Sequence, residues 1–179
     1  MKPNVLLLTI DSLRADKVFG NTKTSLTPNI DNLIKNGIYF TQTISSADGT
    51  GTSLGSLFTG SYPFTTGITH FKFNHDVTTY FQKFKNNGYH VCATIPDVSF
   101  LLKFTENADE QDPYVYDNRR SWLKLDGGIG QQIIDRLDKM PQTPWLYYIH
   151  LQDLHSPFFI PKEFDSVKYG ESGYERMFS

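Results

Sequence analysis

A continuous apolar run at residues 5–10, Val-Leu-Leu-Leu-Thr-Ile, constrains the fold more than any other feature of this chain. Runs without polar alternation are typical of a parallel strand that is buried on both faces. The run therefore predicts a central strand in a sheet with helices on both sides. Apolar residues make up 39% and charged residues 20% of the 179 residues, which suits one folded domain with a sizeable core.

Strand-like and helix-like patterns alternate along the chain, which predicts an α/β fold with a mostly parallel sheet flanked by helices. The helix pattern at residues 27–37 has Thr27 as a cap, Pro28 at the first helical position and Gly37 as a stop. Residues 105–128 are polar and aperiodic, and we expect a surface excursion there. The expected strands cover residues 5–10, 38–44, 89–95 and 144–151, and the other expected helices cover residues 53–58, 77–87 and 129–140.

Charge and cysteine content exclude several classes of function. A net charge of -2 provides no basic field for nucleic acid or an anionic membrane surface. The single cysteine, Cys92, lies in an apolar run, so we expect a core residue, with no disulfide and no thiolate metal cluster. The apolar stretch before Asp11 is too short for a signal peptide or a membrane span, so we expect a cytoplasmic protein without a membrane segment.

Polar residues follow the expected strands where ligands bind in parallel sheets, beyond the carboxyl ends. Asp11 comes directly after the first strand, where a carboxylate can hold a hard divalent cation or cap the next turn. Thr50 lies in a small-residue turn between Gly49 and Gly51, before a short helix whose amides favour an anionic oxygen. The alternative is an ordinary loop in which Thr52 or Ser53 caps that helix.

A third polar segment, residues 148–157, follows the last expected strand and contains His150, Asp153 and His155. Histidine can ligate a metal, bind an oxyanion or protonate a leaving group. The spacing of the two histidines is not that of a helical metal pair, and either one can equally be a satisfied core or surface residue.

Taken together, five segments are similar in order and spacing to the N-terminal portion of the sulfatase family, in the alkaline phosphatase superfamily. They include a first strand with its metal aspartate, a Thr-Pro-Asn segment with its Gly and Phe, the nucleophile helix, a Gly-Tyr before a strand and a His-x-Pro motif. In this chain they are residues 3–16, 27–40, 53–60, 87–89 and 155–158.

The resemblance implies an alkaline-phosphatase-like fold and a metal-dependent hydrolase of sulfate or phosphate esters. It implies Asp11 as a metal ligand, Thr50 as nucleophile and metal ligand, and His155 at the ester oxyanion. The divalent ion would be Ca, Mg, Mn or Zn, and the substrate a small-molecule or saccharide ester. His150 and Asp153 are weaker candidates for the pocket wall, and Arg14 is expected to brace the turn by pairing with Asp16.

The chain departs from the family in ways that favour phosphate esters over sulfate esters as substrates. Thr50 stands where sulfatases have the cysteine or serine that becomes formylglycine, and threonine cannot form that aldehyde. Leu54 replaces an arginine, residues 94–97 lack a lysine-histidine pair, and Ser12 replaces a second aspartate. A threonine nucleophile resembles the phosphoglycerol and phosphoethanolamine transferases of the superfamily, whose phospho-threonine is cleared by water or an alcohol. A catalytically dead anion-binding module is the other alternative.

The family completes its metal site with a Ser-Asp-His-Gly segment, and this tetrapeptide does not occur in the chain. We therefore expect residues 1–179 to be part of a longer domain, incomplete at the C-terminus. On this reading the full-length protein is an enzyme and this portion alone is inactive.

Overall fold

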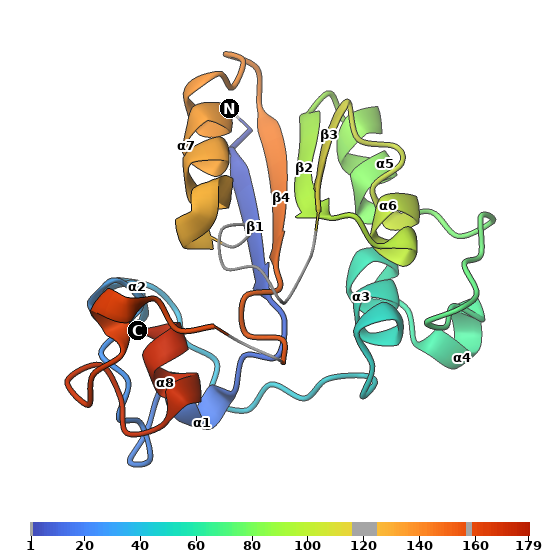
Figure 1. The fold of residues 1–179 in the computed structure, drawn as a ribbon. Helices are drawn as coiled ribbons and strands as arrows, with labels where there is room; N and C mark the ends of the chain where they lie inside the picture. Colours follow the sequence, from blue (N-terminus) through green and yellow to red (C-terminus); the bar gives the residue numbers. More distant parts are fainter. Residues whose placement is uncertain (1, 116–124, 157–158) are drawn as a thin grey trace.

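The computed structural model describes residues 2–115, 125–156 and 159–179, and its centre is a four-stranded parallel sheet (Figure 1). The strand order is β1-β4-β2-β3, and all three strand pairs are parallel. The carboxyl ends of the strands consequently meet at one edge, as the expected α/β fold requires. The strands are β1 (Val5–Ile10), β2 (His90–Pro96), β3 (Glu110–Tyr114) and β4 (Trp145–Leu151).

The expectation that the first strand is central is wrong for the part of the chain that the structure describes. β1 is at one end of the sheet and pairs only with β4 there. Its side chains Leu6 and Leu8 are 51% and 49% exposed. β4 and β2 are the central strands, and each has six buried residues in succession.

Helices cover both faces of the sheet, as expected. α7 (Gly130–Asp138) follows a π-helical turn (Leu125–Ile129) and packs on the face that carries Cys92 and Tyr147. The opposite face packs against α3 (Thr50–Thr59), α5 (Tyr80–Asn86) and α6 (Ser99–Phe104).

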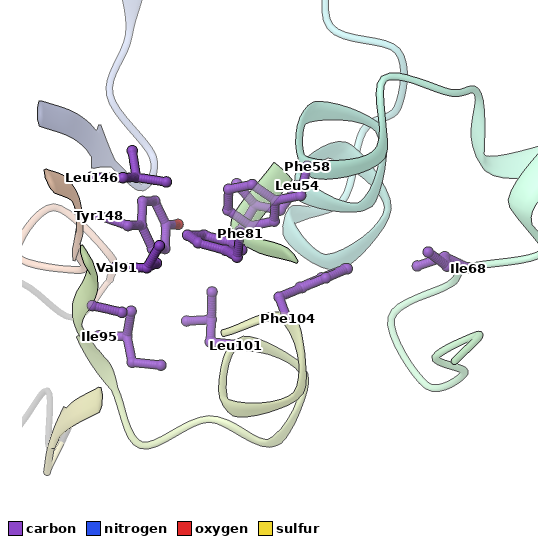
Figure 2. Close-up of a cluster of buried hydrophobic side chains, with 11 residues drawn as sticks. Leu54, Phe58, Ile68, Phe81, Val91, Ile95, Leu101, Phe104, Leu146 and Tyr148 are labelled. Atoms are coloured by element: carbon purple, nitrogen blue, oxygen red, sulfur yellow. The ribbon is translucent and has the colours of Figure 1, made fainter. Parts of the chain in front are cut away.

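The larger core lies between the sheet and these three helices, as Figure 2 shows. Phe58 of α3 is fully buried, and its ring lies against those of Phe81, Phe104 and Tyr148 at centroid distances of 4.9, 5.3 and 5.0 Å. Packing of this kind fixes α3 relative to β4. The start of α3 is therefore held at a defined position near the carboxyl edge.

The short helices α1 (Ala15–Val18), α2 (Pro28–Asn36) and α8 (Gly173–Phe178) lie together on the carboxyl-edge side of the sheet (Figure 1). α8 braces the loop after β1, because the Tyr174 hydroxyl donates to the Ser12 carbonyl at 2.9 Å and accepts from the Arg14 amide at 2.8 Å. The remaining helical turns are α4 (Pro63–Thr66) and η3 (Lys162–Phe164). Among the described residues, no helix has the length and apolar character needed to span a membrane.

The strand expected at residues 38–44 does not form. This segment is an irregular connection between α2 and α3 (Figure 1), with Ile38, Phe40 and Ile44 exposed by 84%, 73% and 92%. A strand needs a hydrogen-bonded neighbour. The described part of the sheet provides none for this segment, although its residue types suit a strand.

The other expected elements are present with shifted bounds. The 27–37 helix begins at Pro28 with Thr27 as N-cap and Gly37 as C-cap, but the Thr27 side chain makes no capping bond and donates to Asp31 at 3.1 Å. α5 begins at Tyr80, three residues late, because Thr79 and Gln82 form a capping box. The polar stretch 105–128 contains β3, and α6 was not expected; residues 116–124 of that stretch lie outside the described residues.

Candidate functional site

Asp11 lies at the carboxyl end of β1, with its backbone amide bonded to the Leu151 carbonyl of β4 at 2.8 Å. Its carboxylate is half-buried and accepts the Ser12 amide at 2.9 Å. Ser12 has a φ of 62°, a left-handed conformation that is uncommon outside glycine. This strained turn directs the Asp11 carboxylate toward the other strand ends, and strain of this kind is concentrated at functional sites.

Thr50 is the first residue of α3, and its hydroxyl lies 3.4 Å from each oxygen of the Asp11 carboxylate. The structure thus brings together the two residues that the sequence predicts as metal ligands, from positions 39 residues apart. The first amides of a helix have no partners within the helix, so the start of α3 offers hydrogen-bond donors to an anion.

The expected capping role of Thr52 or Ser53 is wrong. Gly49 is the N-cap of α3, and no side chain caps the helix. The Thr52 hydroxyl instead donates to the Gly49 carbonyl at 2.9 Å. Gly51, which follows Thr50, packs against the backbone of His70, where an added Cβ would lie 3.0 Å from the His70 Cα.

His150 is the group at this edge whose importance the sequence underestimates. Its side chain is 1% exposed, and Nδ1 is 2.9 Å from the Thr9 hydroxyl and 2.8 Å from the Tyr148 hydroxyl. Its Nε2 has no hydrogen-bond partner among the described residues and lies 4.0 Å from the Asp11 carboxylate. Burial lowers the pKa of His150 to about 4, against the opposing effect of the Asp11 charge, so the ring is neutral at pH 7.

Gln152 is a site residue that the sequence analysis missed. It follows β4 on the same side as His150, and its amide nitrogen is 3.5 Å from the Asp11 carboxylate. Its Oε1 is buried and also has no hydrogen-bond partner within the described ranges. The i, i+2 spacing after His150 was the signal that could have identified it.

The other predicted residues lie in different places. His155 is exposed, lines the same hollow as Asp11 and Thr50, and has Nδ1 3.1 Å from the Ser156 carbonyl. Asp153 is not on this wall, because it accepts the Leu125 amide at 2.8 Å and faces a different cavity. Arg14 and Asp16 form the expected pair, with two bonds of 3.0 and 2.7 Å.

The residues at this edge surround a hollow of about 620 Å³ that is lined by Asp11, Thr50, His150 and His155. A second hollow of about 650 Å³ adjoins it along α3 and shares the walls formed by Ser45 and Ser53. The first hollow has the size and polarity for a small anionic group, and the second gives room for a larger substituent attached to it.

This chain is an open, parallel α/β sheet with a carboxylate, a hydroxyl and a buried imidazole around a hollow at its carboxyl edge, which is the edge where proteins of this class bind ligands. The sequence model of the Sulfatase family matches residues 3–176, nearly the whole chain. The chain therefore belongs to the sulfatase family, as the sequence motifs predict.

Solved structures share this fold. The phosphonate monoester hydrolase of Agrobacterium radiobacter superposes with a TM-score of 0.75 at 14% identity, over 98% of this chain and 44% of that one. BT4656, solved in complex with its substrate D-glucosamine-2-N,6-O-disulfate, gives 0.74 at 17% identity, over 92% and 37%. The C-terminal periplasmic domain of EcEptC from Escherichia coli, in a zinc complex, gives 0.67 at 15% identity, over 99% and 56%.

These structures confirm the alkaline-phosphatase-like fold of the chain. The chain spans between 37% and 56% of the length of these three proteins. At such low identity they are evidence for the fold alone, and the site must be argued from this chain's own residues.

Proposed function

We propose that this chain contributes the nucleophile and part of the metal site of a sulfatase-family hydrolase that cleaves phosphate or sulfate esters. The observation that carries the proposal is the position of Thr50. Its hydroxyl is at the start of α3, 3.4 Å from both Asp11 oxygens, and faces a polar hollow.

The donors present at this edge fit a divalent cation. Asp11 supplies a carboxylate and Thr50 a hydroxyl, which are oxygen ligands that Mg²⁺, Ca²⁺, Mn²⁺ and Zn²⁺ accept. Two buried atoms beside them, His150 Nε2 and Gln152 Oε1, have no partners in the described part of the chain. Buried polar atoms are rarely left unpaired, so this pair supports a bound cation or ordered water between them and Asp11.

In the proposed mechanism Asp11 and Thr50 would hold the cation, which would lower the pKa of the Thr50 hydroxyl and offset the negative charge of the ester. Thr50 Oγ1 loses its proton to solvent and attacks the central atom of the ester, and the bond from that atom to the alcohol oxygen breaks. The amides at the start of α3 donate hydrogen bonds to its equatorial oxygens. His155 contacts a remaining oxygen and, when protonated, donates a proton to the departing alcohol.

Threonine as nucleophile favours phosphate esters, because threonine has no route to formylglycine. Hydrolysis and transfer share the first step, and they differ in whether water or an acceptor alcohol then receives the group from Thr50. The adjoining hollow beside α3 supports a substrate with a sizeable alcohol part, such as a saccharide.

The cation is tested by calorimetric titration of the complete protein with Mg²⁺, Mn²⁺ and Zn²⁺. Asp11→Asn removes the charge of one ligand, so the affinity at this edge should fall at least about tenfold and ester cleavage should be lost. Arg14→Ala is the matched control, because Arg14 pairs with Asp16 outside the hollow. An Asp11→Asn protein with unchanged affinity and turnover would exclude this metal site.

A further inference from the structure

A second cluster of donor atoms lies at the opposite, amino edge of the sheet. His90 and Cys92 project from β2 on one face, and Glu110 is the first residue of β3 and the register partner of Cys92. One ligand atom from each of the three side chains lies within 4.8 Å of the others. His90 Nε2 and Glu110 Oε1 are already 2.8 Å apart.

This cluster is separate from the site at the carboxyl edge. His90 pairs in register with Trp145, the first residue of β4, whereas His150 is five residues further along that strand. Five residues of a parallel strand span roughly 16 Å. The two groups of residues therefore share no ligand.

The donor set matches a borderline divalent cation. Thiolate, imidazole and carboxylate are the three ligand types of Zn²⁺ sites, and the atoms around a tetrahedral Zn²⁺ are about 3.3–3.8 Å from each other. The three ligand atoms already lie within 4.8 Å of one another, and the His90 and Glu110 side chains are 27% and 45% exposed, so they can adjust on their solvent side. Cys92 is fully buried beneath them.

The surroundings favour a cation as well. Among the described residues, the three carboxylates of Asp109, Glu110 and Asp112 pair with two cations, Lys85 and Arg136, so one negative charge is in excess there. Asp109 also lies 3.9 Å from His90 Nδ1, on the side of the ring away from Glu110. A carboxylate there is the usual partner that orients a metal-ligating histidine.

We propose that His90, Cys92 and Glu110 form a second metal site, which binds Zn²⁺ or Co²⁺ and joins the starts of β2 and β3. Binding releases the Cys92 thiol proton to solvent, and the proton on His90 Nε2 moves to Nδ1, which faces Asp109, so that Nε2 can bind the cation. Solvent or a further ligand completes the coordination at the exposed side. The proposal is independent of the function of the carboxyl edge.

Titration of the metal-free full chain with Co²⁺ tests it. Cys92 is the only cysteine of residues 1–179, so in this chain a thiolate-to-cobalt charge-transfer band in the near ultraviolet reports on this cluster. We expect the band to saturate at about one equivalent and to disappear when Zn²⁺ is added. Asp11→Asn should leave the band unchanged, which separates this result from failure of the proposed function.

Two variants keep the test decisive. Cys92→Ser should abolish the band, and because this core change can impair folding, His90→Gln is the second variant and should weaken Co²⁺ binding at least about tenfold. His75→Gln is the control, since His75 is not one of the three donor residues. Its Nδ1 lies 3.6 Å from the Glu106 carboxylate. Absence of a thiolate band in excess Co²⁺, or equal affinity in His90→Gln and the parent protein, would overturn the proposal.

Discussion

The two edges of the sheet differ in how their polar groups are satisfied. At the carboxyl edge, Asp11, Thr50 and His150 surround a hollow through contacts of 3.4 and 4.0 Å, and a buried ring nitrogen has no partner among the described residues. At the amino edge, Arg136 binds both Glu110 and Asp112 directly, and His90 binds Glu110.

This difference indicates that the carboxyl edge contributes to activity and the amino edge to the stability of the fold. Loose contacts around a hollow add little to stability and leave groups available for a ligand, whereas a dense ion-pair network links elements of the fold. Substitution of the exposed His155 at the carboxyl edge should therefore affect activity and hardly affect stability, whereas substitution of Arg136 at the amino edge should affect stability. His150 is buried, and its substitution should change how stability depends on pH. Three variants test this contrast, from the largest expected effect to the smallest.

His155→Ala should lower the turnover of the complete, metal-loaded protein by about 10²–10⁴-fold if this side chain acts as general acid. The side chain is exposed, so the free energy of unfolding should hardly change. Steady-state kinetics beside urea denaturation measures both quantities. A large loss of stability with normal turnover would place His155 among the structural residues and remove it from the mechanism.

His150 should make stability depend on pH. Its pKa is lowered to about 4 in the folded state by burial, and it is near 6.5 when unfolded. Between these values the unfolded chain binds a proton that the folded chain does not, so stability is complete above pH 6.5 and falls as pH decreases toward 4. The slope is at most about 1.4 kcal/mol per pH unit, for a total of about 3 kcal/mol.

Urea denaturation of metal-free protein and of His150→Gln at several pH values isolates this contribution. The stability of the parent relative to the variant should be constant above pH 6.5 and should decline below it. His75→Gln is the matched control for removal of a histidine. A parent-minus-variant difference that does not change between pH 7 and pH 4.5 would show that His150 is protonated equally in both states.

Arg136→Ala should destabilise the fold by about 1–2 kcal/mol, because it removes charged hydrogen bonds to Glu110 and Asp112 that are only partly exposed. Hydrogen bonds from Arg136, and then from His90, lower the pKa of Glu110 below its usual value, because both donors stabilise the ionised carboxylate. Arg14→Ala removes an exposed pair and should change stability very little. Equal effects of the two substitutions, measured by chemical denaturation, would contradict the contrast between the edges.

Much of the fold could be predicted from local sequence. The apolar runs at residues 5–10, 89–95 and 144–151 identified β1, β2 and β4 as strands, although only β2 and β4 have six buried residues in succession. β3 could not be found this way, because its sequence Glu-Gln-Asp-Pro-Tyr is polar and contains Pro113. It is tolerated at an end of the described sheet, where proline needs no ladder partner and Arg136 neutralises the carboxylates.

The position of each strand within the sheet could not be predicted from local sequence either. Leu6 and Leu8 are as apolar as the residues of β4, yet they are half exposed, because strand order depends on pairing between distant segments. The same reasoning applies to Ile38 and Phe40, whose residue types suit a strand without specifying a neighbour.

The candidate site was predictable where a residue follows a strand or a motif, as for Asp11, Thr50 and His155. The close approach of His150 and Gln152 to Asp11 was not, because it depends on the pairing of β1 with β4. The role of Thr52 was also misjudged, since the helix begins at Thr50, three residues earlier than its pattern indicates.

The proposal that Thr50 is the nucleophile is tested most directly by identifying the residue that becomes covalently modified. The complete protein with its divalent cation is quenched during turnover of a phosphate ester and digested, and the peptides are sequenced by mass spectrometry. We expect one phosphoryl group on Thr50. The Thr50→Ala variant should fold normally but should form no adduct and cleave no ester. An adduct on Thr52, or full activity in Thr50→Ala, would contradict the proposal.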